Sequence, residues 1–495
     1  MRRAGKAVAA VTFTAVLLTA VAAAACALLF AGDAPAPSSA LPVYDLDIVY
    51  DGDRSVTLRE DIYLVNDGSE TSEDIALHLY ANAFSEGNPS PPYASGEEDD
   101  FFFGEPSFGD IRISSVKING KTVDPVISED EQLLTLPVSL DPGESADIEL
   151  VCSLTLPRCR GRMGVKSRSI DLAGFYPVLC VRENGRWRTD AYTPFGDPFY
   201  SEISSFYVTL TAPADLAVAC SGKALSRSVR DGFAVTTIAA ERVRDFALSL
   251  SRDFRLSRAK VRTGGGTVEI NYHSLSDPAP ESTLAAITYA VEEFSRVFGD
   301  YPYDTFTVAQ TELVSGGMEY GSFAVISDAA SGEALADIAV HETAHQWWFG
   351  VVGSDQLNSP WLDEGLAEFS VGYLRLLRGD EEGYRAFVRE AESAYLAYRR
   401  LPAALGFDPA LQRPLSSFLT SGEYAAVAYA KGVLLMDALL SLAGEERFSD
   451  ALARYYSSCA FDIASPSDLI VAFKEAGFDA EGVIASFSRG TDVIA

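Results

Sequence analysis

The segment HETAH at residues 341–345 constrains the fold of this chain more than any other part of the sequence. It holds two of the chain's four histidines, His341 and His345, four residues apart. On an α-helix this spacing places both imidazoles on one face, where both can reach one metal ion. Glu342 lies beside them and is placed to take a proton from a zinc-activated water. The segment therefore predicts a zinc site on a helix over residues 333–350; two histidines satisfied by hydrogen bonds alone are the alternative.

A third ligand must come from elsewhere in the chain, because catalytic zinc is held by three side chains and keeps one position open. A metzincin would place a histidine six residues after His345, but that position is Val351. The segment SPWLDEGLAEFSVGYLRLLRG, residues 359–379, predicts a second helix with Glu364 and Glu368 on one face. We expect Glu364 to be the third ligand. Glu368 is expected to hold the outer nitrogen of a zinc-bound histidine, and a solvated surface acid is the equal alternative.

Length and charge narrow the class of protein. The 495 residues suggest two or three domains, and an apolar content of 48% supports large cores. Lys and Arg total 39 against 70 Asp and Glu, which gives a net charge of −31. Such an acidic body repels phosphate backbones, so nucleic acid is not expected as a partner.

The N-terminal residues 1–32 predict a membrane anchor or a signal segment. Arg2, Arg3 and Lys6 precede an uncharged run over residues 7–32, which as a helix would extend roughly 37 Å. The basic residues favour the cytoplasmic side, so we expect a single-pass protein of the cell membrane with its catalytic body outside the cytoplasm. Secretion after cleavage of a signal peptide is the alternative.

The cysteines allow two interpretations. Outside the cytoplasm a disulfide is possible, and Cys152 with Cys159 is the nearest pair in the sequence. Buried, inert thiols are the alternative, and they are the expectation for most of these cysteines.

Residues 44–251, after a Pro-, Ala- and Ser-rich linker at 33–43, alternate apolar and polar residues in short runs. This pattern predicts an all-β N-terminal domain, a sandwich or a saddle. Asn119-Gly120 predicts a two-residue hairpin turn. The acidic and aromatic segment SGEEDDFFFGE, residues 95–105, is expected to be a solvated loop with a hydrophobic foot.

Residues 252–495 read mainly as helices broken by Gly and Pro, with a short strand pattern near residues 304–313. The apolar residues of 281–299 recur with helical spacing and end at Gly299. The fold class is therefore multidomain α+β, with a mainly α-helical second domain that contains the HETAH segment.

The segments HETAH and WLDEGLAE together resemble the gluzincin metallopeptidases, and SGGMEYGSF at residues 315–323 is similar to the Gly-x-Met-Glu-Asn strand of the aminopeptidase N family. The resemblance implies a thermolysin-like catalytic domain. It also implies one zinc ion per chain, held by His341, His345 and Glu364, with Glu342 as the general base.

Three further roles follow from the same resemblance. Glu319 would bind the free α-amine of a peptide substrate, and Gly316 and Gly317 would present backbone groups to it. Tyr429, in a Tyr-x-Lys-Gly segment, would stabilise the oxyanion, with Tyr424 as the alternative.

The sequence departs from the family pattern at three points. The asparagine that ends the Gly-x-Met-Glu motif is Tyr320 here. The family's second amine anchor, a Gln or Glu of the β domain, has no clear counterpart near TDAYTPFGDPFYSE, residues 189–202. The catalytic domain ends without the large helical domain that follows in many relatives, so a more open cleft is expected.

Taken together, these features predict a membrane-anchored extracytoplasmic zinc metallopeptidase, an aminopeptidase acting on peptides with a free N-terminus. An endopeptidase or oligopeptidase with the same zinc site is the first alternative. A catalytically silent peptide-binding or scaffold protein is the alternative from another class. The sequence carries no signal for an oligomeric state.

Overall fold

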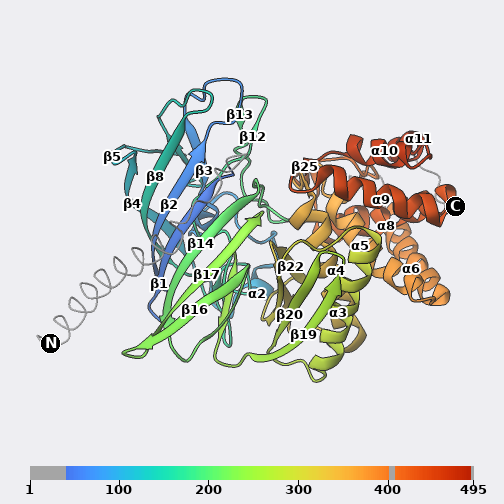
Figure 1. Ribbon diagram of the computed structural model, residues 1–495, viewed down its shortest axis with the longest axis horizontal. Coiled ribbons are helices and arrows are strands. Elements are labelled where there is room, and N and C mark those ends of the chain that lie inside the picture. The colour runs from blue at the N-terminus through green and yellow to red at the C-terminus, as the bar shows by residue number, and fades with distance from the viewer. Residues whose placement is uncertain (1–40, 401–406, 492–495) are drawn as a thin grey trace, which may run out of the picture. The chain divides into compact units, whose positions relative to one another are not determined.

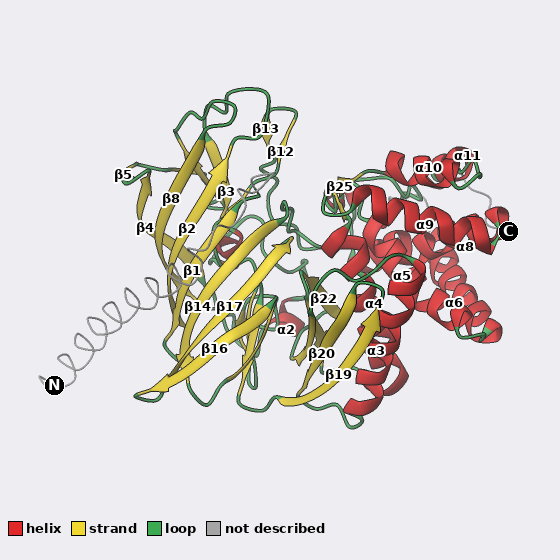
Figure 2. Cartoon of the chain, in the orientation of Figure 1, coloured by secondary structure: helices red, strands yellow, loops and turns green. Residues whose placement is uncertain are grey.

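The computed structural model describes residues 41–400 and 407–491, and the described residues from Leu41 onward form one compact unit (Figure 1). The predicted membrane segment at 1–32 and most of the linker lie outside the described residues. Strands gather in the N-terminal half and helices in the C-terminal half (Figure 2). The predicted α+β fold class is therefore confirmed.

The N-terminal half is built on an eight-stranded sheet. Its strand β14 shows why these residues form a sheet, since buried and half-buried positions alternate along its whole length. The pairing is antiparallel except where β1 runs parallel to β14. In spatial order the sheet contains β16 (Lys223–Arg230), β17 (Phe233–Val243), β14 (Ser204–Pro213), β1 (Val43–Tyr50), β2 (Ser55–Val65), β8 (Ser145–Thr155), β4 (Asp110–Ile118) and β5 (Lys121–Thr122).

Smaller sheets and short helices complete this half. One sheet joins β15 (Ala217–Cys220), β18 (Leu248–Ser251), β10 (Ile170–Leu172) and β9 (Gly164–Val165). Another joins β11 (Val178–Leu179), β3 (Ile75–His78), β7 (Leu133–Leu136) and β6 (Val126–Ile127), and β12 (Arg182–Glu183) pairs with β13 (Arg186–Trp187). The helices here are η1 (Tyr80–Phe84) and α2 (Glu98–Phe101).

The predicted hairpin turn is present between β4 and β5. Asn119 and Gly120 have φ angles of 51° and 74°, both in the left-handed region. Two consecutive residues with positive φ are what a type I′ turn requires, and Asn-Gly supplies them at little cost.

The C-terminal half begins with a five-stranded sheet, where the sequence predicted only one short strand pattern besides the Gly-Gly-Met-Glu segment. In spatial order it contains β19 (Arg255–Thr263), β20 (Gly266–Ser274), β21 (Thr305–Thr311), β23 (Phe323–Ser327) and the edge strand β22 (Gly317–Tyr320). The outer strand β19 is mostly exposed, so its sequence lacks the apolar run of a buried strand.

Helices follow this sheet and enclose the second core. They are α3 (Pro280–Val297), α4 (Gly332–Ala344), α5 (Trp361–Leu377), α6 (Glu381–Arg399), α7 (Ser421–Tyr424), α8 (Gly432–Ala443), α9 (Glu445–Cys459), α10 (Pro466–Glu475) and α11 (Glu481–Ser488). Short elements between them are η2 (Gln346–Val351), β24 (Gly353–Ser354), η4 (Leu415–Ser417), η5 (Ala425–Lys431) and β25 (Ile463–Ala464).

The predicted helix over residues 333–350 is shorter than expected. α4 ends at Ala344, and the π-helical turn η2 follows, with non-helical backbone angles at Trp348 and Phe349. Trp347, Trp348 and Phe349 are all buried. A regular helix rotates by about 100° per residue and would direct these three consecutive side chains over about 200°. The irregular turn lets all three enter the core.

Within the described residues, burial distinguishes an apolar core helix from a membrane-spanning one. One helical stretch there, Ser421–Ala443, is long and apolar enough to cross a membrane, but 67% of its most apolar window is buried inside the protein. It packs against α5 and α6 as a core helix does.

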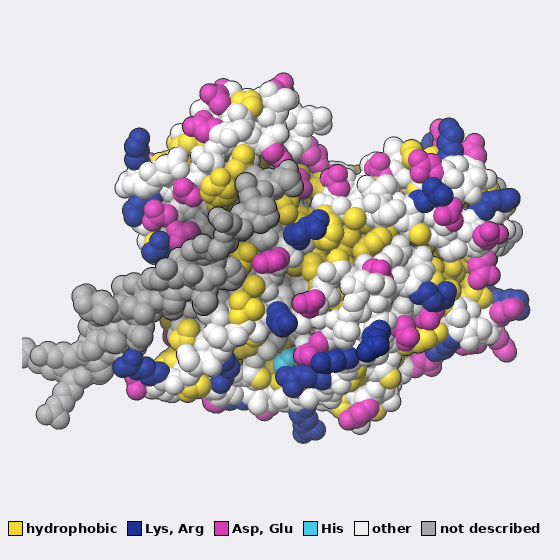
Figure 3. Space-filling model, in the orientation of Figure 1, with side chains coloured by type: hydrophobic (Ala, Val, Ile, Leu, Met, Phe, Trp, Pro, Cys, Tyr) yellow, Lys and Arg dark blue, Asp and Glu magenta, His cyan; other side chains and the backbone are white. Residues whose placement is uncertain are grey.

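On the face shown in Figure 3, acidic and basic side chains are interspersed rather than segregated.

The cysteines of the described residues are free and buried, so the possible pair Cys152–Cys159 is not a disulfide here. Burial raises the pKa of both thiols, which makes them poor nucleophiles.

Candidate active site

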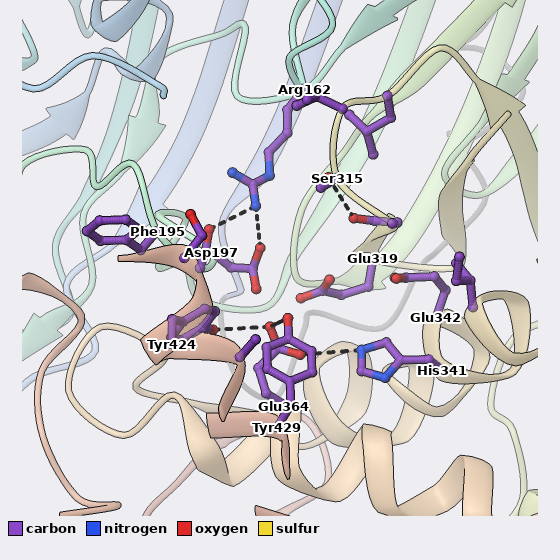
Figure 4. A pocket seen from close by; sticks show the side chains of 18 of the residues that line it. Arg162, Phe195, Asp197, Ser315, Glu319, His341, Glu342, Glu364, Tyr424 and Tyr429 are labelled. Atoms are coloured by element: carbon purple, nitrogen blue, oxygen red, sulfur yellow. Dashed lines mark hydrogen bonds and ion pairs between the residues drawn. The ribbon is translucent and has the colours of Figure 1, made fainter. Parts of the chain in front are cut away.

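Two helices bring the predicted metal ligands together. His341 lies on α4, His345 directly follows the last residue of α4, and Glu364 lies on α5; these helices pack side by side, with His341 and Glu364 turned toward each other (Figure 4). The two Nε2 atoms are 3.0 Å apart, and Glu364 Oε2 lies 3.3 Å and 3.4 Å from them. All three side chains are buried.

The outer nitrogens of both histidines have acceptors. His341 Nδ1 lies 2.8 Å from Glu368 Oε2, and His345 Nδ1 lies 3.4 Å from the carbonyl oxygen of Trp348. When each Nδ1 carries a proton, each Nε2 has a lone pair available for a metal ion. Glu368 thus occupies the place expected for it, and the irregular turn after α4 supplies the second acceptor.

These residues fit a zinc ion. Three lone-pair atoms converge on one point, and Glu364 Oε2 is buried without a hydrogen-bond donor among the described residues. Burying such a carboxylate oxygen costs free energy unless a cation compensates its charge. Two imidazole nitrogens and one carboxylate oxygen form a donor set of catalytic zinc sites.

Glu342 projects from α4 toward the edge strand β22. Its Oε2 is buried and has no hydrogen-bond partner among the described residues. Burial raises the pKa of Glu342 to about 8, and Glu364 and Asp197 add to this rise against the opposing effect of His341. A raised pKa suits a group that must accept and return a proton.

Gly317 permits this position of Glu342. A Cβ atom on Gly317 would lie 2.2 Å from Glu342 Oε1, so only glycine leaves room for the carboxylate.

The carbonyl groups of Gly316 and Gly317 differ in the hydrogen bonds that they accept. The Gly316 carbonyl accepts from Ser327 N–H at the start of the β22–β23 pairing, whereas the Gly317 carbonyl faces the Ser315 hydroxyl at an exposed position. The carbonyl of Gly316 is therefore already occupied.

Glu319 projects from β22 into the same cavity as Glu342 and Glu364 (Figure 4). It is 3% exposed, and Gln356 Nε2 donates to its Oε1 at 3.3 Å. Burial raises the pKa of Glu319 well above its usual range, and Asp197 and Glu342 raise it further. A cation between these carboxylates would relieve their mutual repulsion.

No sequence pattern predicted that Asp197, Arg162 and Gln356 belong to this site. Arg162 Nη2 donates to Asp197 Oδ1 at 2.7 Å and holds this β-domain carboxylate at the cavity wall opposite Glu319 (Figure 4). Asp197 lies within the segment that gave no clear amine anchor. Only the folded chain brings Arg162 and Asp197, 35 residues apart, to the helices that carry His341 and Glu364.

Both candidate tyrosines reach the cavity. The Tyr429 hydroxyl donates to Glu364 Oε1, and the Tyr424 hydroxyl lies 3.2 Å from the same oxygen. The π-helical turn η5 carries Tyr429 and stacks its ring on His341 at a centroid distance of 5.6 Å. Tyr429 is half-buried and Tyr424 is buried, so Tyr429 is the more accessible donor.

The cavity around these residues has a volume of about 670 Å³ and is strongly acidic. Eight of its lining residues are Asp or Glu, against one Arg and no Lys. The segment 95–105 contributes to it, because Glu97, Asp100 and Phe101 line the cavity. This segment has the expected buried foot at Phe101 and Phe102, but it is also part of the cavity wall.

Comparisons with known proteins agree with this geometry. Residues 285–488 match the Peptidase family M1 domain. Aminopeptidase 2 of Candida albicans is 23% identical over 404 residues, which cover 74% of this chain and 41% of the relative. Aminopeptidase N of Haemonchus contortus is 29% identical over 30% of this chain and 15% of the relative. This chain therefore spans less than half the length of either curated relative.

Solved structures extend the likeness to the whole fold. The M1 zinc metallopeptidase of Deinococcus radiodurans has a TM-score of 0.67 and 20% identity, covering 92% of this chain and 95% of that one. A mutant of that protein has been solved bound to a Tyr-Ser-Ala substrate, with the same score and coverage. This chain therefore shares its fold, a β-rich half followed by a helical half, with the Deinococcus radiodurans protein.

Proposed function

We propose, from the premise that this chain is a gluzincin metallopeptidase resembling the aminopeptidase N family, that it removes N-terminal residues from peptides. One observation carries the proposal. A zinc-type ligand triad, an unpartnered general base and a buried cation-binding carboxylate, Glu319, share one acidic cavity. We further propose one zinc ion per chain, bound by His341, His345 and Glu364.

The chain's own residues perform the proton transfers. When bound, zinc supplies a Lewis acid that polarises the scissile carbonyl and acidifies water. Glu342 accepts the proton of the attacking water at Oε2 and returns it to the leaving amine. The Tyr429 hydroxyl donates to the carbonyl oxygen as negative charge develops there, with Tyr424 as the alternative donor.

The substrate's amine has a matching site. The α-ammonium group binds between Glu319 and Asp197, where it compensates two buried carboxylates. Gln356 and Arg162 hold these carboxylates in place. The open edge of β22 pairs with the peptide backbone, and the Gly317 carbonyl, which accepts from the exposed Ser315 hydroxyl at 3.3 Å, takes part with its second lone pair. This arrangement fixes the distance from the amine to the scissile bond and favours an aminopeptidase over an endopeptidase.

We also propose where the protein is located and how the chain divides into domains. Residues 1–32 anchor the protein in the cell membrane with the catalytic body outside the cytoplasm, as the three basic residues before the apolar run indicate. Residues 44–251 form the β domain and residues 252–495 the catalytic domain. Fractionation of cells expressing the full chain tests the anchor: recovery in the membrane fraction supports it, and recovery only in the medium contradicts it.

The activity is tested with matched peptides that carry a free or an acetylated N-terminus. The body lacking residues 1–40 and its Glu342→Gln variant are incubated with both, and cleavage positions are read by mass spectrometry. Stepwise loss from free amines alone, absent in Glu342→Gln, is the expected result. Equal internal cutting of both peptides would identify an endopeptidase and contradict the amine site. Zinc-loaded protein that cleaves neither peptide would favour a silent binding protein.

A further inference from the structure

The segment that carries α2 closes one side of the cavity and is fixed there from two directions. The Ser421 hydroxyl, at the start of α7, donates to Glu97 Oε1 at 2.7 Å and so links the β domain to the catalytic helices. On the other side, Arg160 N–H donates to the Phe101 carbonyl. A Cβ on Gly161 would lie 2.8 Å from the Phe101 ring, so glycine lets this ring pack closely. The segment is therefore a built wall of the site.

Two uncompensated carboxylates lie on this wall. Glu97 and Asp100 line the cavity, are exposed, and form no ion pair with any residue the structure describes. The one Arg of the lining, Arg162, is already paired with Asp197. Because charge on the wall is unbalanced, the potential at this side of the cavity attracts cations.

Aromatic side chains lie beside these carboxylates. Tyr93 and Phe101 line the cavity with their ring centroids 5.0 Å apart, and Phe195 lines it from the segment that carries Asp197. Lys and Arg side chains combine an apolar stem with a cationic end, and they bury the stem while the charge stays hydrated. Their cations are also attracted to aromatic faces. Aromatic walls next to a carboxylate rim match such a side chain.

The rim is within reach of the reacting groups. Ser421, which binds Glu97, and Tyr424, whose hydroxyl lies 3.2 Å from Glu364 Oε1, belong to the same short helix, α7. They are three residues apart, about 4.5 Å along a helix axis. A Lys or Arg side chain close to the scissile bond can therefore span from the catalytic centre to the rim.

We propose that Glu97 and Asp100, with Tyr93, Phe101 and Phe195, form a subsite that selects peptides carrying a Lys or Arg side chain next to the scissile bond. This proposal rests on the proposed peptidase function and adds the substrate class. The cation lies among the aromatic rings and is attracted by the two carboxylates. An acidic side chain at the same place is repelled by them, and a neutral one of equal length gains only the aromatic contacts.

The test uses peptides that differ only in charge. Two series place lysine, Nε-acetyl-lysine or glutamate at the N-terminal or the second residue, and kcat/KM is measured for release of the N-terminal residue. The enzymes are wild type, the double variant Glu97→Gln with Asp100→Asn, and Asp99→Asn. Asp99 is the matched control, because it is exposed on the same helix α2 but does not line the cavity.

In one of the two peptide series, the kcat/KM of wild type is expected to be roughly five- to tenfold higher for the lysine peptide than for the acetyl-lysine peptide. This is the effect of two partly screened charges. The double variant loses most of this preference and Asp99→Asn keeps it. Added salt reduces the preference, because the rim is exposed. Equal rates for lysine and acetyl-lysine in both series would overturn the proposal, and so would a preference that survives in the double variant.

A binding measurement separates this proposal from the proposed function. Calorimetry on Glu342→Gln, with and without the two rim substitutions, compares affinities for the lysine and acetyl-lysine peptides. Tighter binding of lysine that depends on Glu97 and Asp100 supports the subsite even where wild type cleaves no peptide, an outcome that would sink only the peptidase function. Equal affinities for the two peptides would overturn the subsite while leaving the peptidase function intact.

Discussion

The position of the Glu342 side chain depends on the absence of a side chain at Gly317. The Glu342 carboxylate occupies the space where any larger residue at position 317 would place its Cβ, 2.2 Å from Glu342 Oε1. At Gly316 the same added atom would meet only Ile338, at 3.8 Å. Neighbouring glycines of one motif therefore face different constraints.

This contrast gives a prediction at the residue scale. Gly317→Ala must displace Glu342 and is expected to lower kcat by about 10²-fold, since misplacing a catalytic group by about 1 Å has that effect. Gly316→Ala adds an ordinary contact and is expected to lower kcat at least tenfold less. Steady-state kinetics of both variants at equal zinc content check this. Equal losses in the two variants would show that Gly317 is not needed for the position of Glu342.

The residue types of the metal site could be predicted from the sequence, because helical spacing alone places His341 beside His345 and Glu364 beside Glu368. Asp197, Arg162 and Gln356 could not be. All three lie in loops, and no local periodicity connects Arg162 with Asp197 or Gln356 with Glu319. The roles of the predicted residues in binding and catalysis stay predictions.

At the scale of elements, α5 and the start of α8 approach each other closely, and Tyr429 of η5, the turn that leads into α8, lines one cavity with Glu364 of α5. A Cβ on Gly432 would lie 2.5 Å from Gly365 Cα, and one on Gly365 would lie 3.0 Å from Gly432 Cα. The two helices therefore cross at a glycine-to-glycine contact. The glycines in WLDEGLAE and YAKG are explained by this crossing.

Separating these helices is expected to damage both stability and catalysis. Gly432→Ala forces backbone apart and should lower the free energy of unfolding by about 1–3 kcal/mol, with a fall in kcat as Tyr429 moves from Glu364. Gly482→Ala is the matched control. Among the described residues, an added Cβ at Gly482 in helix α11 meets no packed neighbour within 4 Å, so helix propensity predicts a slight gain in stability. Thermal unfolding of both variants checks this, and equal melting temperatures would contradict the crossing.

Elements with strong periodicity were predictable, whereas irregular turns were not. Helices α3 and α5 and the β4–β5 hairpin lie where their patterns placed them. The π-helical turns η2 and η5 arise because buried aromatic residues and active-site side chains must reach places that a regular helix cannot offer. Strand β19 was missed because an exposed outer strand carries little apolar signal.

At the scale of the whole molecule, burial of histidine makes stability depend on pH. His78 lies on β3 away from the metal site, is 4% exposed, and stacks on Tyr80 at 4.6 Å. Burial lowers its pKa from an ordinary value of 6.5 to about 4. The folded chain therefore holds His78 neutral where the unfolded chain protonates it.

The sign of the effect follows from proton binding. Between pH 6.5 and about 4 the unfolded state binds more protons at this site, so His78 lowers stability as pH falls through that window. Between pH 7.5 and 5, wild type should lose about 2 kcal/mol more than His78→Gln, at about 1.4 kcal/mol per pKa unit. Urea denaturation of both proteins at saturating zinc measures this difference. Identical losses would show that His78 does not titrate in this way.

Formation of one zinc-dependent centre involves the whole molecule, because two helices and two halves of the chain must meet there. Its most direct test is a crystal structure of the zinc-loaded protein with anomalous diffraction recorded on both sides of the zinc edge. We expect one zinc peak per chain between His341 Nε2, His345 Nε2 and Glu364 Oε2, with Glu342 adjacent. Fully zinc-loaded protein with its peak elsewhere, or peptide hydrolysis by protein shown to lack zinc, would contradict it.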